Sequence, residues 1–195
     1  MFKREEYAVV LDFLAQGHAQ EAKKEPVAQI LGEEYFTLLE VVLKSGLSVS
    51  VGERLYIGRE TRDKVDHIKG RVTSNALTAS ASRELLGVVS KIVSEREAHF
   101  LDFLNRAGSL NIRAHSLELL PGIGKKHLND ILDARDKQKF SSFEDAQSRV
   151  PHLGKLKDIF VQRILEELKG DSKYYLFVKI PQKTHERSER FDRRR

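Results

Sequence analysis

The sequence predicts an α+β protein in which a small β barrel or sandwich precedes an all-helical half. Over residues 1–76, short β-branched apolar runs alternate with glycine-containing turns at a spacing of about ten residues, which is typical of small antiparallel β domains. From residue 77 onward, apolar residues recur instead at the three- and four-residue spacing of amphipathic helices.

Four apolar runs are the predicted strands of the first half: Tyr7–Leu14, Pro26–Gly32, Tyr35–Lys44 and Gly52–Gly58. Glycines and short polar clusters separate them, as expected for turns between antiparallel strands. The part Phe36–Lys44 also fits a helical period, because short apolar runs are ambiguous, and we predict a strand there.

Residues 77–108 are predicted to connect the β half to the rest of the chain through one long helix. The segment Ala81–Ala107 contains no proline, and its apolar residues keep helical spacing throughout. Thr78 or Ser80 can cap its first turn. Its single glycine, Gly87, is the expected position of a kink.

Residues 109–170 are predicted to form an all-helical domain of short helices. These are a single turn at Ser116–Leu120, a helix at Lys125–Arg135, a helix opened by the capping-box signature Ser141–Glu144, and a helix at Lys155–Lys169.

The C-terminal end is predicted to add one strand and a tail. Within residues 171–182, the run Tyr174–Ile180 is expected to be a late strand that packs on the β half. Residues 183–195 hold six basic and three acidic side chains, and we expect them to be disordered. This tail either adds phosphate contacts or serves only as a solubilising end.

Composition excludes several classes of protein. The chain has 34 Lys and Arg against 29 Asp and Glu, a formal charge of +5 and no Cys. Without Cys there are no disulfides, Cys-ligated zinc sites, iron–sulfur clusters or thiol catalysis. The longest uncharged run, Val72–Ser82, is too short to cross a bilayer, which takes about 20 residues. The charged N-terminus does not resemble a signal peptide, so we expect a cytoplasmic protein with no membrane partner.

The positive charge is unevenly distributed. Residues 1–53 hold five basic and nine acidic side chains, whereas residues 54–71 hold six basic and three acidic ones. The excess therefore lies in one stretch of the first half and in the tail. This distribution indicates which faces would meet an anionic partner rather than whether one exists.

The segment Leu120–Lys126 reads Leu-Pro-Gly-Ile-Gly-Lys-Lys between two predicted helices. Pro121 ends the first helix, while Gly122 and Gly124 permit backbone conformations and a close approach that a Cβ would block. Ile123 is the apolar residue expected to anchor the turn in the core.

The helix after this turn begins at Gly124 or Lys125, so its free N–H groups and positive dipole end point outward. Such a helix start is an anion site, and phosphate is the expected anion. Lys125 and Lys126 add positive charge at its rim. The alternative is a tight turn between helices that binds nothing, because Gly-x-Gly alone is a weak signal.

This segment resembles the helix-hairpin-helix motif of nucleic-acid-binding proteins that do not read sequence. The resemblance continues to Val150–Lys155, where Gly154 follows Gly124 by thirty residues, the layout of a tandem repeat. His152 stands where the first copy has Gly122, so the second copy departs from the motif. Gly154 and Lys155 complete the residues that the resemblance assigns to phosphate binding.

Residues 5–181 are also similar to an archaeal family known as domain of unknown function 655. The likeness is carried by Glu6–Asp12, Tyr35–Glu40, Asp66–Ile68, Arg113–His115, Leu117–Lys126 and Tyr174–Val178. The resemblance implies an OB-like β barrel beside tandem helix-hairpin-helix motifs, with a role in nucleic-acid binding.

An OB-like barrel would give a function to the basic stretch that begins at residue 54. Such barrels bind strands through a cationic groove and exposed aromatic rings. Tyr56 lies between Arg54 and Arg59, with Arg62 following, and the four are candidate nucleic-acid contacts. The alternative is a salt-bridged loop in which Tyr56 is buried.

Other polar clusters carry weaker signals. Asp63, Asp66 and His67 fit either a metal or nuclease cluster or a solvated loop. Arg113 and His115 lie just before the first hairpin and either contact phosphate or cap the turn. Phosphate-binding loop, dinucleotide-binding and nucleophile-elbow motifs are all absent from the sequence.

These observations predict a non-catalytic protein that binds nucleic acid largely without reading sequence, and that needs no cofactor. RNA ranks ahead of DNA on the OB resemblance alone. One alternative is a metal-dependent nuclease or modifying enzyme that uses Asp63 and Asp66. The other is a scaffold for a protein partner. The sequence leaves the oligomeric state open.

Overall fold

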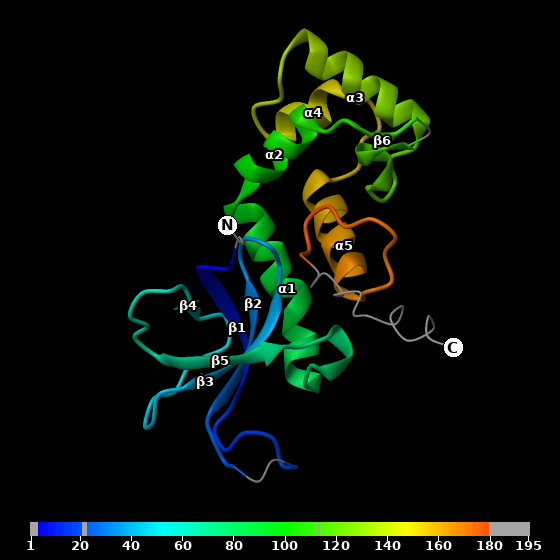
Figure 1. Ribbon diagram of the computed structural model, residues 1–195. Helices are drawn as coiled ribbons and strands as arrows, with labels where there is room; N and C mark the ends of the chain where they lie inside the picture. The colour runs from blue at the N-terminus through cyan, green and yellow to red at the C-terminus, as the bar shows by residue number, and fades with distance from the viewer. Residues whose placement is uncertain (1–3, 21–22, 113, 180–195) are drawn as a thin grey trace, which may run out of the picture.

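A curled five-stranded antiparallel sheet forms the first half of the protein (Figure 1). The computed structural model describes residues 4–20, 23–112 and 114–179. The strands are β1 (Tyr7–Leu14), β2 (Val27–Gly32), β3 (Leu38–Leu43), β4 (Arg54–Tyr56) and β5 (Val65–Arg71), in the order β4-β1-β2-β3-β5. The ambiguous third run is thus a strand, as predicted.

The sheet is curled into a half-barrel, which is consistent with the small barrel expected from the sequence. Within the described residues, β4 pairs only with β1 and β5 pairs only with β3, so these strands are the two edges of an open sheet. β4 is only three residues long, which leaves few backbone groups for closing the ring. The broader prediction of an α+β protein with the β half first is confirmed.

Both faces of the sheet are buried over its central strands β1, β2 and β3. Along β1, Ala8 and Val10 contribute to a small core of the β half, whereas Val9 and Leu11 face a larger cluster that includes the first helix. This alternation follows from the two-residue period of strand side chains. It explains why the sequences of these three strands are apolar almost throughout.

The predicted long helix is two helices, α1 (Ala79–Glu95) and α2 (Glu97–Arg106). Its first turn is capped as expected, because the Thr78 hydroxyl accepts the N–H of Ala81 at 3.0 Å. The expected kink at Gly87 is wrong, and the break lies at Arg96. The Arg96 guanidinium donates to the carbonyl of Glu33, which ties the break to a turn of the sheet.

The helical half is built from short elements. They are the 3-10 turns η1 (Ser74–Ala76) and η2 (Ser116–Leu119), the ribbon strands β6 (Ser109–Asn111) and β7 (Ala114–His115), and helices α3 (Lys125–Lys137), α4 (Phe143–Arg149) and α5 (Leu156–Leu168). The three helices were predicted within a few residues, and α4 is capped by the Ser142 hydroxyl. The two-stranded ribbon was not predicted.

The predicted late strand does not form over the described residues 171–179, which are irregular. The buried carboxylate of Glu167 in α5 accepts the N–H groups of Leu176, Phe177 and Val178 at 2.7–2.9 Å. These donors are therefore unavailable to a sheet. Residues 180–182 and the basic tail, residues 183–195, lie outside the described part of the chain.

A single aromatic cluster joins the β half to the helical half. Phe100 of α2 lies at its centre, with ring centroids 6.4 Å from Phe36, 5.0 Å from Phe160 and 5.4 Å from Phe177. These partners come from the β2–β3 turn, from α5 and from the C-terminal segment. The larger buried cluster therefore includes residues of the β half, the connecting helices, the helical half and the C-terminal segment.

Candidate nucleic-acid interface

The turn at residues 120–123 holds the start of α3 in place. The N–H of Ile123 donates to the carbonyl of Leu120 at 3.1 Å, and Gly122 adopts a φ of 78°. Proline at the second position and a positive φ at the third are typical of a type II turn. Leu120 and Ile123 are buried, so the prediction that Ile123 anchors the turn is confirmed.

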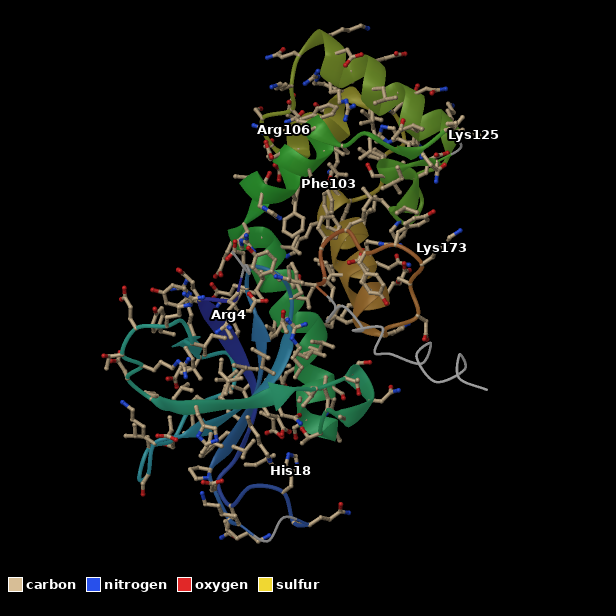
Figure 2. The ribbon with its side chains drawn as sticks, in the orientation of Figure 1. Arg4, His18, Phe103, Arg106, Lys125 and Lys173 are labelled. Carbon is tan, nitrogen blue, oxygen red and sulfur yellow. The ribbon has the colours of Figure 1, made fainter. Side chains whose placement is uncertain are left out.

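The first turn of α3 is open to solvent. Gly124 is its N-cap and has no side chain with which to cap the helix, and the first turn contains no acidic residue. A Cβ added at Gly124 would meet no atom within 4 Å among the described residues, and its φ of −91° suits any residue. Lys125 and Lys126 are exposed beside it, and Figure 2 shows Lys125 at this end of the helix.

A second turn with the same backbone geometry lies thirty residues later. The N–H of Leu153 donates to the carbonyl of Val150 at 3.4 Å, and His152 adopts a φ of 60°. His152 thus occupies the left-handed conformation of Gly122, which few residues other than glycine adopt.

The second turn differs from the first at the start of the following helix. The N–H of Leu156, the first residue of α5, donates to the side-chain oxygen of Gln147 at 2.9 Å. A Cβ at Gly154 would lie 3.5 Å from the side chain of Ile159. Lys155 is exposed as the N-cap residue. The chain itself therefore occupies part of this helix start, unlike that of α3.

The basic stretch of the β half is occupied by internal contacts. Arg54 makes a two-pronged ion pair with Glu33 at 2.8 and 2.9 Å, and its guanidinium lies 3.5 Å from the ring centroid of Tyr7. Hydrogen bonding to Glu33 raises the pKa of Arg54 above its ordinary value. The ring of Tyr56 packs edge-on against Tyr7 at 5.3 Å. Arg54 and Tyr56 therefore share one face of the sheet, but Tyr7 covers part of both.

The remaining residues of this stretch form a folded loop. The hydroxyl of Tyr56 accepts the N–H of Glu60 at 3.3 Å and lies against Gly58. Arg62 donates to the carbonyl of Gly58 at 2.9 Å. Arg59 is exposed. The structure thus brings Arg54 and Tyr56 together, engages Arg62 in the loop, and leaves Arg59 facing solvent.

The other polar side chains singled out from the sequence form no shared site in the described part of the chain. His67 and Asp66 pair at 2.7 Å on the exposed edge strand. The described part of the chain contains no group of three His, Asp or Glu side chains arranged to hold a metal ion. His115 caps η2 by accepting the N–H of Leu117, whereas Arg113 lies outside the described residues. No described helix has the length and apolar character to span a membrane.

The sequence interpretation missed a hollow of about 310 Å³ beside the start of α3. Its lining includes Ile112 at the tip of the ribbon, His115, Lys125 and Asn129. The only signal for this feature was the polar–apolar alternation that follows Gly108, and that run was too short to predict a ribbon.

The structure is that of an α+β protein in which a curled antiparallel sheet shares a core with a helical half, and this helical half contains two turns of the same geometry. The model of a family described as protein of unknown function, DUF655, matches residues 4–179, and the chain belongs to this family.

Two relatives share its sequence over nearly the whole chain. The uncharacterized protein MJ0038 of Methanocaldococcus jannaschii is 42% identical over 180 residues, which cover 91% of this chain and 81% of that protein. The crystal structure of Af1531 from Archaeoglobus fulgidus is also 42% identical and superposes with a TM-score of 0.81, covering 90% of this chain and 100% of the other.

Proposed function

We propose that this protein binds nucleic acid through its phosphate backbone, largely independently of sequence and without catalysis. The supporting observation is the start of α3, where an N-cap glycine leaves the helix end open and two exposed lysines flank it. Backbone N–H groups and the helix dipole attract an anion at such a position. Contacts of this kind hold the phosphate and do not distinguish bases.

In this proposal the two turns are a tandem helix-hairpin-helix pair with unequal roles. Each turn is closed by a backbone hydrogen bond from an N–H to the carbonyl three residues earlier, and Gly122 and His152 both have a positive φ. These two similarities support the pairing. The first hairpin grips phosphate through Gly122–Gly124, Lys125 and Lys126. The second, with Leu156 already bonded to Gln147, has a mainly structural role and contributes charge through Lys155.

In this proposal the β half is an OB-like surface that contacts nucleic acid mainly through positive charge and less through base stacking. Tyr56 already packs against Tyr7 and Gly58, so its ring offers less free surface than the sequence suggested. Arg59 is one of the exposed cations of this stretch. RNA is favoured over DNA as the ligand only because this half resembles OB folds.

The proposal predicts that Lys125→Glu/Lys126→Glu weakens binding to single-stranded RNA, single-stranded DNA and duplex alike. Reversing two charges beside the phosphate should lower affinity on the order of tenfold or more at low salt. The slope of log affinity against log salt should become shallower by about 1 for each phosphate that the variant no longer neutralises. Fluorescence anisotropy across a salt series measures both quantities.

The matched control is Lys137→Glu/Lys139→Glu, the same charge reversal at exposed positions near the other end of α3. It should weaken binding less and leave the salt slope closer to that of the wild type. Equal binding by the wild type and Lys125→Glu/Lys126→Glu would refute the phosphate assignment.

A further inference from the structure

An apolar side chain projects fully into solvent at the tip of the β6–β7 ribbon. Ile112 has a relative exposure of 106%, and Leu110 on the same ribbon is 40% exposed. The other exposed large apolar side chains among the described residues are 38–57% exposed. Holding an isoleucine entirely in water forgoes the stabilisation that burial of such a side chain provides.

The base of the ribbon fixes the direction of this tip. The N–H and the hydroxyl of Ser116 both donate to the carbonyl of Gly108, at 3.0 and 2.7 Å. The N–H of His115 donates to the carboxylate of Glu118 at 2.9 Å. The two strands therefore leave the helical half from an anchored point, and Ile112 directly follows the first of them.

The tip lies beside the proposed phosphate grip. Ile112 and Lys125 line the same hollow, and Figure 1 shows the ribbon next to the starting end of α3. A phosphate held at that helix end would bring the attached nucleotides next to the ribbon. The combination of an exposed apolar tip and adjacent lysines matches the two parts of a nucleic acid, its bases and its phosphates.

We propose that the ligand of this face is base-paired nucleic acid and that Ile112 enters its minor groove and separates one base step. Apolar wedges, isoleucine among them, act in this way in proteins that bind the minor groove. A single strand would instead favour an aromatic ring for stacking, and isoleucine has no π face. This inference rests on the proposed function, because Lys125 and the start of α3 supply the phosphate contact that holds the duplex.

The test compares the full-length wild type with Ile112→Ser on short RNA and DNA duplexes of one sequence. Each duplex carries 2-aminopurine at alternate steps, so that the point of insertion need not be known in advance. The fluorescence of 2-aminopurine rises when its neighbours unstack. Leu86→Ser, which removes a 57% exposed leucine from α1, is the matched control.

The wild type and Leu86→Ser should bind at least one duplex and raise its fluorescence. Ile112→Ser should bind that duplex on the order of tenfold more weakly, the loss expected when one apolar side chain stays in water. It should also lose the fluorescence rise while keeping its affinity for single strands and its thermal unfolding midpoint.

Two results overturn the inference, and they are distinguishable. If the wild type binds duplex and Lys125→Glu/Lys126→Glu does not, but Ile112→Ser behaves as the wild type, the wedge is wrong and the phosphate grip stands. If the wild type binds no nucleic acid at all, the proposed function fails and the wedge fails with it. In that case the exposed apolar tip of the ribbon is assigned to contact with a protein partner.

Discussion

At the scale of single residues, the two glycines of the first hairpin have different physical reasons to be glycine. Gly122 adopts a φ of 78°, which an L side chain rarely tolerates, so the turn itself favours glycine. Gly124 has an ordinary φ and open space around it, and the fold places no such demand there. A side chain at Gly124 would occupy the place where the proposed phosphate approaches.

Substituting Gly124 should therefore separate stability from binding. Gly124→Asp and Gly124→Asn both supply an oxygen that caps α3, and each should raise the free energy of unfolding by a few tenths to about 1 kcal/mol. Gly124→Asp should also weaken nucleic-acid binding much more than Gly124→Asn, because its carboxylate repels the phosphate. Urea denaturation and anisotropy titration measure the two effects. Unchanged binding by Gly124→Asp would exclude this helix start as the phosphate site.

Two buried carboxylates illustrate how single residues determine loop structure. Glu5 accepts the N–H groups of Glu34, Tyr35 and Thr37, and Glu167 does the same for three residues of the C-terminal segment. In each case one carboxylate accepts the backbone N–H groups that the carbonyls of a neighbouring strand would otherwise accept. A single buried carboxylate can thus hold several consecutive backbone N–H groups in an irregular conformation.

At the scale of elements, η2 depends on a histidine that must be neutral. The Nδ1 atom of His115 accepts the N–H of Leu117, and Glu118 accepts the N–H of His115, which completes a capping box. Burial lowers the pKa of His115 below its ordinary value of 6.5, and the charge of Arg135 acts in the same direction. Protonation removes the acceptor on which the cap depends.

Stability should accordingly fall as the pH drops through about 6.5 toward the lower pKa of the folded state. In that range the unfolded chain binds a proton that the folded His115 does not, so acid favours unfolding. His115→Asn keeps an acceptor without a titrating ring and should flatten this part of the pH profile. One histidine contributes at most about 1.4 kcal/mol per pH unit. An unchanged slope in His115→Asn, measured by urea denaturation, would contradict the role of its titration.

At the scale of the whole molecule, one core holds the sheet and the helices together. Phe100 is fully buried and contacts aromatic rings from the β2–β3 turn, α5 and the C-terminal segment. Figure 2 shows the neighbouring Phe103 pointing toward α5 from the same helix. Because these contacts cross both halves, their unfolding should be coupled.

Phe100→Ala should lower the free energy of unfolding by about 3–5 kcal/mol, as expected for a large side chain removed from a closed core. Amides of β2 and of α5 should lose protection together in native-state hydrogen exchange. Leu86→Ala, at an exposed position on α1, should change both quantities little. Full retention of protection in β2 when α5 opens would show that the halves are independent.

The local features of this fold were predictable from the sequence because short-range sterics and periodicity determine them. The order of strands and helices follows from the two periods of apolar residues. The turn at Leu120–Ile123 follows from a proline and a glycine, and the buried Ile123 follows from its place between two glycines. The sequence therefore predicts the turn that precedes the proposed phosphate site.

Contacts between residues distant in sequence decided the rest. The predicted helix breaks at Arg96, whose side chain donates to the carbonyl of Glu33, and Glu167 takes the backbone donors that a late strand would have needed. Tyr7 and Glu33 engage Arg54, which the charge pattern alone left free. Sequence by itself determined the segments that become β1 to β4 and α3 to α5 and the turn before α3, because those choices depend on neighbours, whereas it did not indicate β5 or the β6–β7 ribbon. Tertiary structure decided which charges and rings remain exposed to a ligand, because burial and pairing depend on the whole chain.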